Sequence, residues 1–115
     1  MSLSRVSRFS RLLAGFSGAS AVGAGAYGAH KFKPKDQHYS IVYQRANQYH
    51  LIHSFLLGMA PLARYPVPVA SLATLGIIGF SGSCYVVALT EDRTWSAGAP
   101  FGGMALIAAW LAFAL

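Results

Sequence analysis

The sequence predicts an all-α, integral membrane protein folded as an antiparallel four-helix bundle. Of its 115 residues, 55% are hydrophobic and only 10% are charged, whereas about a quarter of the residues in a soluble domain are charged. Four apolar runs cover about residues 12–29, 43–63, 67–89 and 97–115. Basic residues flank these runs, as they do where helices leave a bilayer. The length fits one domain.

The first run, residues 12–29, is dominated by Gly, Ala and Ser. Small residues recur in it at every fourth position, for example at Gly15, Ala19 and Gly23. This spacing lets helix backbones approach closely in lipid. It predicts a first helix that lies centrally in the bundle and is packed on several sides.

Polar connections and prolines separate the other three runs. Residues 31–44, which include Pro34, are the main polar connection, and residues 65–68 form a tight connector. The third run, residues 67–89, holds 23 residues without a charge, enough to cross a hydrocarbon core of about 30 Å. The fourth run contains Gly98-x-x-x-Gly102, which we expect to pack within the chain.

The N-terminal segment, residues 1–11, contains three Arg, four Ser and no acidic residue. This composition is typical of a mitochondrial matrix-directed segment. A secretory signal and a basic flank that anchors the first helix to lipid headgroups are alternatives. Residues 12–115 are the expected transmembrane domain. With four spans both termini lie on the same side, and four basic residues against five give no bias in orientation.

The second run carries polar side chains at membrane depth, including Asn47, His50 and His53. Such groups are costly in lipid and need partners. They could hold a metal with His30 or His38, ligate haem between the first two helices, or conduct protons or a polar solute. The favoured interpretation is structural, with hydrogen bonds that tie the helices together.

The sequence offers little support for an enzyme. It lacks G-x-S-x-G, HExxH, a P-loop and paired carboxylates. Gly23-x-Gly25-x-x-Gly28 matches the dinucleotide-binding pattern, but no strand precedes it, so packing is the better interpretation. Cys84 is the only cysteine, and no basic stripe stands apart from the membrane flanks. We therefore expect no catalytic residue, no cofactor or metal, and no nucleic-acid partner.

Five motifs in order resemble the transmembrane protein 256 family over about residues 15–115. They are Tyr27-Gly28-Ala29-His30, Tyr43-x-x-Ala46-Asn47-x-Tyr49-His50-x-x-His53-Ser54, Phe80-Ser81-Gly82-Ser83-x-Tyr85, Ala99-Pro100-x-Gly102-Gly103 and Trp110-Leu111. The resemblance implies four transmembrane helices, bacterial inner-membrane relatives of unknown function and, for animal members, a mitochondrial association. It implies no catalytic residue.

Together these observations predict a small non-enzymatic protein of the mitochondrial inner membrane. Its partners would be the lipid bilayer and a larger membrane complex, in which it would be an accessory or assembly component. The alternative is a small transporter or proton relay that uses His50 and His53. The motif residues expected to form an interhelical polar network are Tyr27, His30, Asn47, His50, His53, Ser81, Ser83 and Tyr85.

Overall fold

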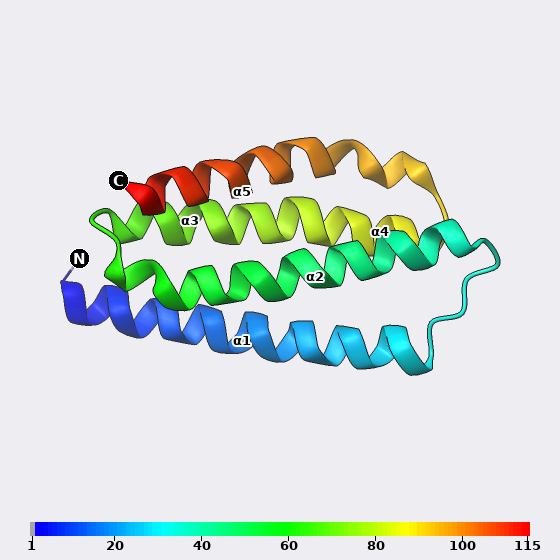
Figure 1. Cartoon of the computed structure of the whole chain (residues 1–115), viewed down its shortest axis with the longest axis horizontal. Coiled ribbons are helices and arrows are strands. Elements are labelled where there is room, and N and C mark those ends of the chain that lie inside the picture. Colours follow the sequence, from blue (N-terminus) through cyan, green and yellow to red (C-terminus); the bar gives the residue numbers. More distant parts are fainter. Residues whose placement is uncertain (1) are drawn as a thin grey trace.

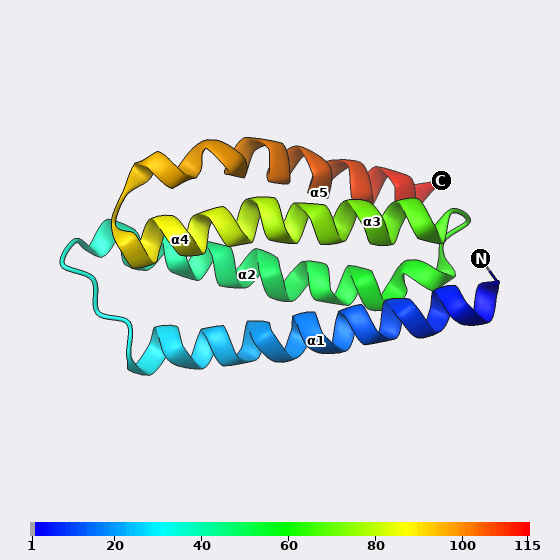
Figure 2. The same cartoon turned by 180° about the vertical axis from the view of Figure 1, so that it is seen from behind.

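The computed structural model describes residues 2–115 and confirms an all-α bundle of four antiparallel helices (Figures 1 and 2). Two of these helices change between helix types along their length and therefore carry several labels. Pro66–Thr90 comprises α3, η2 and α4, and Arg93–Ala114 comprises η3 and α5. The elements in chain order are α1 (Leu3–His30), α2 (Gln37–Met59), η1 (Ala60–Leu62), α3 (Pro66–Gly76), η2 (Ile77–Gly82), α4 (Ser83–Thr90), η3 (Arg93–Gly98) and α5 (Ala99–Ala114). We call the continuous rod Pro66–Thr90 the third helix; its η2 part is π-helical.

The helices are arranged in series. α1 packs mainly on α2, α2 packs on the third helix, and the third helix packs on α5. The molecule measures 49 × 25 × 18 Å, and α1 and α5 form its opposite edges (Figure 1). The prediction that the first helix is central is therefore wrong. A Cβ at Gly15, Gly18 or Gly23 would meet no atom within 4 Å, so no close helix contact within the chain requires a glycine at these positions.

The second helix begins earlier than the sequence analysis predicts. Asp36 caps it by accepting a hydrogen bond from the backbone N–H of His38 (2.9 Å), a typical N-cap interaction. The connection therefore comprises only residues 31–36, and residues 37–44 are already helical. The backbone N–H of Asp36 also donates to Glu91 Oε1 (3.2 Å), which links this connection to the end of α4.

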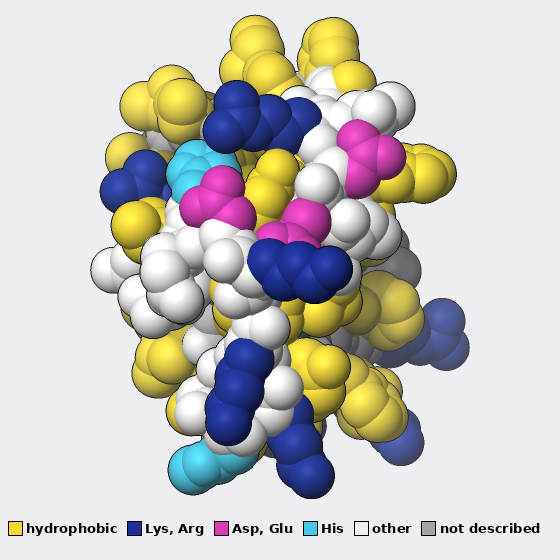
Figure 3. All heavy atoms as spheres, turned by 90° about the vertical axis from the view of Figure 1, so that its right-hand side faces the viewer, with side chains coloured by type: hydrophobic (Ala, Val, Ile, Leu, Met, Phe, Trp, Pro, Cys, Tyr) yellow, Lys and Arg dark blue, Asp and Glu magenta, His cyan; other side chains and the backbone are white. Residues whose placement is uncertain are grey.

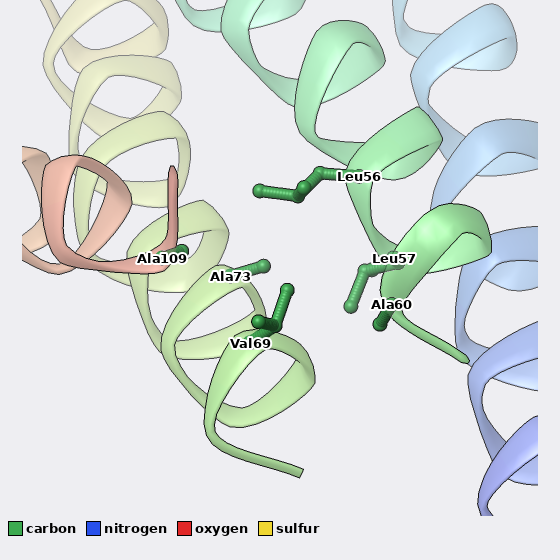
Figure 4. Close-up of a cluster of buried hydrophobic side chains, with 6 residues drawn as sticks. All are labelled: Leu56, Leu57, Ala60, Val69, Ala73 and Ala109. Carbon is green, nitrogen blue, oxygen red and sulfur yellow. The ribbon is translucent and has the colours of Figure 1, made fainter. Parts of the chain in front are cut away.

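Small side chains make up much of the core. The buried cluster in Figure 4 joins α2 and η1 to α3 and α5 and consists of Leu56, Leu57, Ala60, Val69, Ala73 and Ala109. The Gly98-x-x-x-Gly102 pair packs against the third helix, because a Cβ at Gly102 would overlap the backbone of Phe80 and one at Gly98 would lie 2.7 Å from Ser83 Oγ. The predicted intramolecular use of this motif is confirmed.

Within residues 2–115, two helices are long and apolar enough to cross a membrane. They are Pro66–Thr90 and Arg93–Ala114. α1 and α2 have 28 and 23 residues, so their length suffices, but both carry polar residues. That these two helices also cross the membrane stays a prediction, and the position of their polar side chains bears on it.

Candidate functional site: a buried polar seam

The polar side chains of α2 gather on the face that packs against α1. Tyr43, Asn47, His50 and Ser54 recur at intervals of three or four residues, which places them on one side of a helix. Tyr43, His50 and Ser54 are buried. We call this set of side chains the polar seam: it comprises Tyr43, Asn47, His50 and Ser54 of α2, Ser17 and Ser20 of α1, and Tyr85 of α4.

Tyr85 connects α4 to the seam. Its hydroxyl lies 3.1 Å from Asn47 Nδ2 and 3.0 Å from His50 Nδ1. Asn47 Nδ2 also donates to the backbone carbonyl of Ala21 (2.7 Å). The asparagine amide therefore bridges α1 and α4. Gly25 leaves space for this amide because it has no side chain, since a Cβ there would lie 2.9 Å from Asn47 Oδ1.

The geometry fixes the direction of the hydrogen bonds at His50. The Ser20 hydroxyl donates to the Ser17 carbonyl (2.9 Å), and a hydroxyl has only one proton to donate. His50 Nε2 must therefore donate to Ser20 Oγ (3.2 Å), and Nδ1 then accepts from Tyr85. The imidazole is neutral in this arrangement, with both ring nitrogens in use.

The remaining hydroxyl groups of the seam are also hydrogen-bonded. Ser54 Oγ donates to the carbonyl of His50 (2.7 Å), so Ser17 Oγ donates to Ser54 Oγ (2.6 Å). The Tyr43 hydroxyl donates to the carbonyl of Ala24 (2.5 Å). Each of these groups has its proton directed to a partner, which is the condition under which polar groups are tolerated in lipid.

His53 faces a different neighbour. Its Nδ1 bonds the carbonyl of Tyr49 (2.7 Å), and its Nε2 accepts from Trp110 Nε1 of α5 (3.0 Å). Because a carbonyl only accepts and an indole N–H only donates, His53 is neutral with its proton on Nδ1. The two histidines thus serve separate interfaces, α2 with α1 and α4 for His50, and α2 with α5 for His53.

The structure brings together only part of the predicted network. Asn47, His50 and Tyr85 share hydrogen bonds, and His53 bonds Trp110 instead. The other four predicted residues lie elsewhere. Tyr27 and His30 are exposed on α1, Ser81 is buried with an unpaired Oγ, and Ser83 packs against Gly98.

Sequence reasoning missed several groups of the seam. Ser17 lies in the run dominated by Gly, Ala and Ser, and Trp110 lies in the last of the five motifs, yet both make hydrogen bonds to side chains of α2. The only signal for Ser17 and Ser20 was their spacing of three residues in an otherwise apolar run. The carbonyls of Ala21 and Ala24 carry no signal in a sequence.

The described residues hold no convergent set of metal ligands. No group of three or more His, Cys, Asp or Glu side chains within residues 2–115 could hold a metal ion. His30, the predicted partner of His50, is exposed at the C-terminal end of α1, whereas His50 bonds Ser20 in the middle of that helix. The arrangement is therefore suited to joining helices.

The fold and the seam define a small helical protein in which the polar groups of the seam are paired inside an apolar shell. Residues 24–103 match the family described as protein of unknown function DUF423. The chain belongs to this family of small membrane proteins.

Several bacterial proteins described as membrane proteins are similar to this chain over most of its length. The UPF0382 membrane protein YwdK of Bacillus subtilis (strain 168) is 36% identical over 99 residues, which is 79% of this chain and 80% of the relative. The UPF0382 membrane protein SH2409 of Staphylococcus haemolyticus is 35% identical over 97 residues, again 79% and 80%. The UPF0382 inner membrane protein YgdD of Escherichia coli (strain K12) is 31% identical over 111 residues, 90% and 85%. No solved structure matches the chain.

Proposed function

We propose that the protein is a non-enzymatic, four-span component of the mitochondrial inner membrane, of the transmembrane protein 256 type, that serves a larger membrane complex as an accessory or assembly subunit. The observation that carries this proposal is that the ring nitrogens of both histidines already have hydrogen-bond partners within the protein. Both nitrogens of His50 and of His53 have partners, so neither imidazole is left to bind a substrate or a metal.

The outward faces of α1 and α2 support four spans. Phe16 and Val22 of α1 and Ile41 and Phe55 of α2 are each more than half exposed. Between these helices, Ser17 bonds Ser54 and Ser20 bonds His50. A helix pair that is apolar outside and polar inside fits lipid, because the polar groups are satisfied within the protein.

The N-terminal composition supports the mitochondrial part of this proposal, and the bacterial relatives support a membrane location. Residues 2–10 supply four serines and two arginines of the basic segment, the composition of matrix-directed segments. A relative from Escherichia coli is described as an inner membrane protein. Import of the full chain into isolated mitochondria, followed by carbonate extraction and protease protection, tests this location.

The open edge of α1 supports a larger complex. Gly15, Gly18 and Gly23 present backbone with no atom of this chain near their Cβ positions, and small faces let another helix approach closely. We expect Gly15→Leu/Gly23→Leu to release the protein from its complex. Val22→Leu is the control, because Val22 is exposed on the same helix but is not small.

Complexome profiling of mitochondria tests the complex directly. The full chain should migrate at high mass, the glycine double variant should shift toward a free species of 12.2 kDa, and Val22→Leu should migrate like the original chain. Migration of the original chain only as the free species would refute the accessory role.

A proton relay is the second candidate, favoured by the hydrogen-bonded chain Asn47–Tyr85–His50–Ser20, which ends at the backbone carbonyl of Ser17. Histidine can pass a proton by changing tautomer. The test is reconstitution in liposomes with an imposed pH gradient. Proton and solute fluxes that match those of empty liposomes refute it. Fluxes that are lost in His50→Ala but retained in His53→Ala support it, because His53 bonds only the Tyr49 carbonyl and Trp110 and lies outside this chain.

A further inference from the structure

A groove runs between α1 and the third helix from the N-terminal end of the bundle toward the seam. Two adjoining cavities form it, with volumes of about 380 and 580 Å³, and both are lined by Leu13 and Thr74. The first cavity begins at Val6 and Val67, and the second reaches Ile78 and the edge of the seam.

The walls of this groove are apolar and its length matches one leaflet. Val67 to Ile78 is 12 residues, and the 11 steps between them correspond to about 16 Å of helix, close to half of a hydrocarbon core of about 30 Å. The polar groups of its wall are short hydroxyl side chains, together with His50 and Tyr85 where the groove reaches the seam. Thr74 is satisfied by the carbonyl of Ala70 (2.8 Å), whereas Ser71, one turn below the mouth, is exposed.

The mouth of the groove is strongly basic. Arg5 lies one turn before Phe9, which lines the groove. Arg64 lies two residues before the start of the third helix, with its guanidinium 5.5 Å from the Tyr65 ring centroid. Arg8 and Arg11 are at the same end. The three acidic residues of the chain, Asp36, Glu91 and Asp92, all lie at the opposite end (Figure 3).

The basic segment is part of the folded bundle. Val6 and Ser10 are only 6% and 1% exposed, so α1 is held in place at the level of the mouth. Arg5 therefore sits on an ordered helix beside the groove.

We propose that this groove is a binding site for an anionic phospholipid. One acyl chain lies along the apolar wall between α1 and the third helix, and the phosphate of the headgroup meets Arg5 and Arg64. Ser71 lies at the depth of the ester carbonyls and donates its hydroxyl proton to one of them. The uncompensated positive charge at the mouth selects the anionic headgroup over a zwitterionic one.

The test is native mass spectrometry of the full chain released from nanodiscs that contain equal amounts of phosphatidylglycerol and phosphatidylcholine with identical acyl chains. We expect phosphatidylglycerol adducts to exceed phosphatidylcholine adducts roughly tenfold, because each arginine near a headgroup contributes to the preference. Arg5→Gln/Arg64→Gln should remove the preference. Lys33→Gln/Arg45→Gln, which removes two exposed charges at the other end, should leave it unchanged.

A second pair of variants tests the groove itself. Ser71→Phe should fill the groove and abolish the adducts of both lipids, whereas Leu75→Phe, on an exposed position outside the groove, should retain them. Equal adducts of the two lipids in the original chain, or the same loss from both charge pairs, would overturn the proposal. So would a dimer mass without lipid that disappears in Ser71→Phe, since a second copy would then fill the groove. If Ser71→Phe does not fold by circular dichroism, the arginine pair, which lies on exposed positions, decides.

Discussion

The contact between α5 and the π-helical segment η2 is the tightest helix crossing in the bundle and gives the sharpest prediction. A Cβ at Gly102 would overlap the backbone nitrogen of Phe80 and lie 2.8 Å from its Cα. Carbon atoms prefer separations of about 3.5–4.0 Å. Gly102→Ala therefore forces the two backbones apart, and no side chain can rotate away to relieve the overlap.

The adjacent glycine provides a matched control. A Cβ at Gly103 would lie 3.7 Å from Cδ2 of Phe80, an ordinary van der Waals contact. Overpacking costs about 1–3 kcal/mol, and the rigid backbone contact places Gly102→Ala near the upper value. Gly103→Ala should instead gain about 0.5–1 kcal/mol from the lower entropy of its unfolded chain. The two variants should differ by about 3–4 kcal/mol in free energy of unfolding.

Reversible unfolding in mixed micelles of a non-ionic detergent and dodecyl sulfate, followed by far-UV circular dichroism, measures this difference. The two variants have the same composition, so changes in detergent binding cancel in the comparison. Equal stabilities within 1 kcal/mol would refute the close approach of α5 to η2.

Three further predictions concern single groups. Tyr85→Phe removes the hydrogen bonds to Asn47 and His50 and should lower the free energy of unfolding by roughly 1–2 kcal/mol in the same micelles, since such bonds average about 0.6 kcal/mol each in a membrane protein. Trp110→Phe leaves Nε2 of His53 without its donor, so His53 should become reactive to diethyl pyrocarbonate, as followed by mass spectrometry; unchanged modification would contradict the bond. Hydrogen bonds from the side chain and the backbone N–H of Thr94 hold the pKa of Asp92 below its ordinary value of 3.8. Because the folded pKa is the lower one, this stabilisation is present above pH 3.8 and is lost as the pH falls through the folded pKa; Asp92→Asn should show no such acid step by NMR or unfolding.

Composition and the apolar runs were sufficient to predict the four-helix bundle. The order of the helices in space was not predictable from them. The glycines of the first run occur on two sides of α1, and only one side is used, where Gly25 and Gly28 meet Asn47 and Tyr43. A pattern of small residues shows that a close approach is possible, but it does not say to which partner.

The site was predictable only for side chains whose polarity is unexpected in an apolar run. Asn47, His50 and His53 stand out in α2, whereas the serines of α1 do not, because serine is common in any small-residue helix. Backbone carbonyls accept from Asn47 and Tyr43. Such acceptors have no sequence signature and could be found only from coordinates.

The directions of the hydrogen bonds separate the roles of the two histidines. His53 bonds a carbonyl on one nitrogen and an indole N–H on the other; neither partner can reverse, so its tautomer is fixed. His50 bonds two hydroxyls, Ser20 and Tyr85, and a hydroxyl can donate or accept. Reversal of the seam would require Ser20 to release the carbonyl of Ser17. If this protein moves protons, His50 is the histidine that can pass them, and His53 is confined to holding α5 against α2.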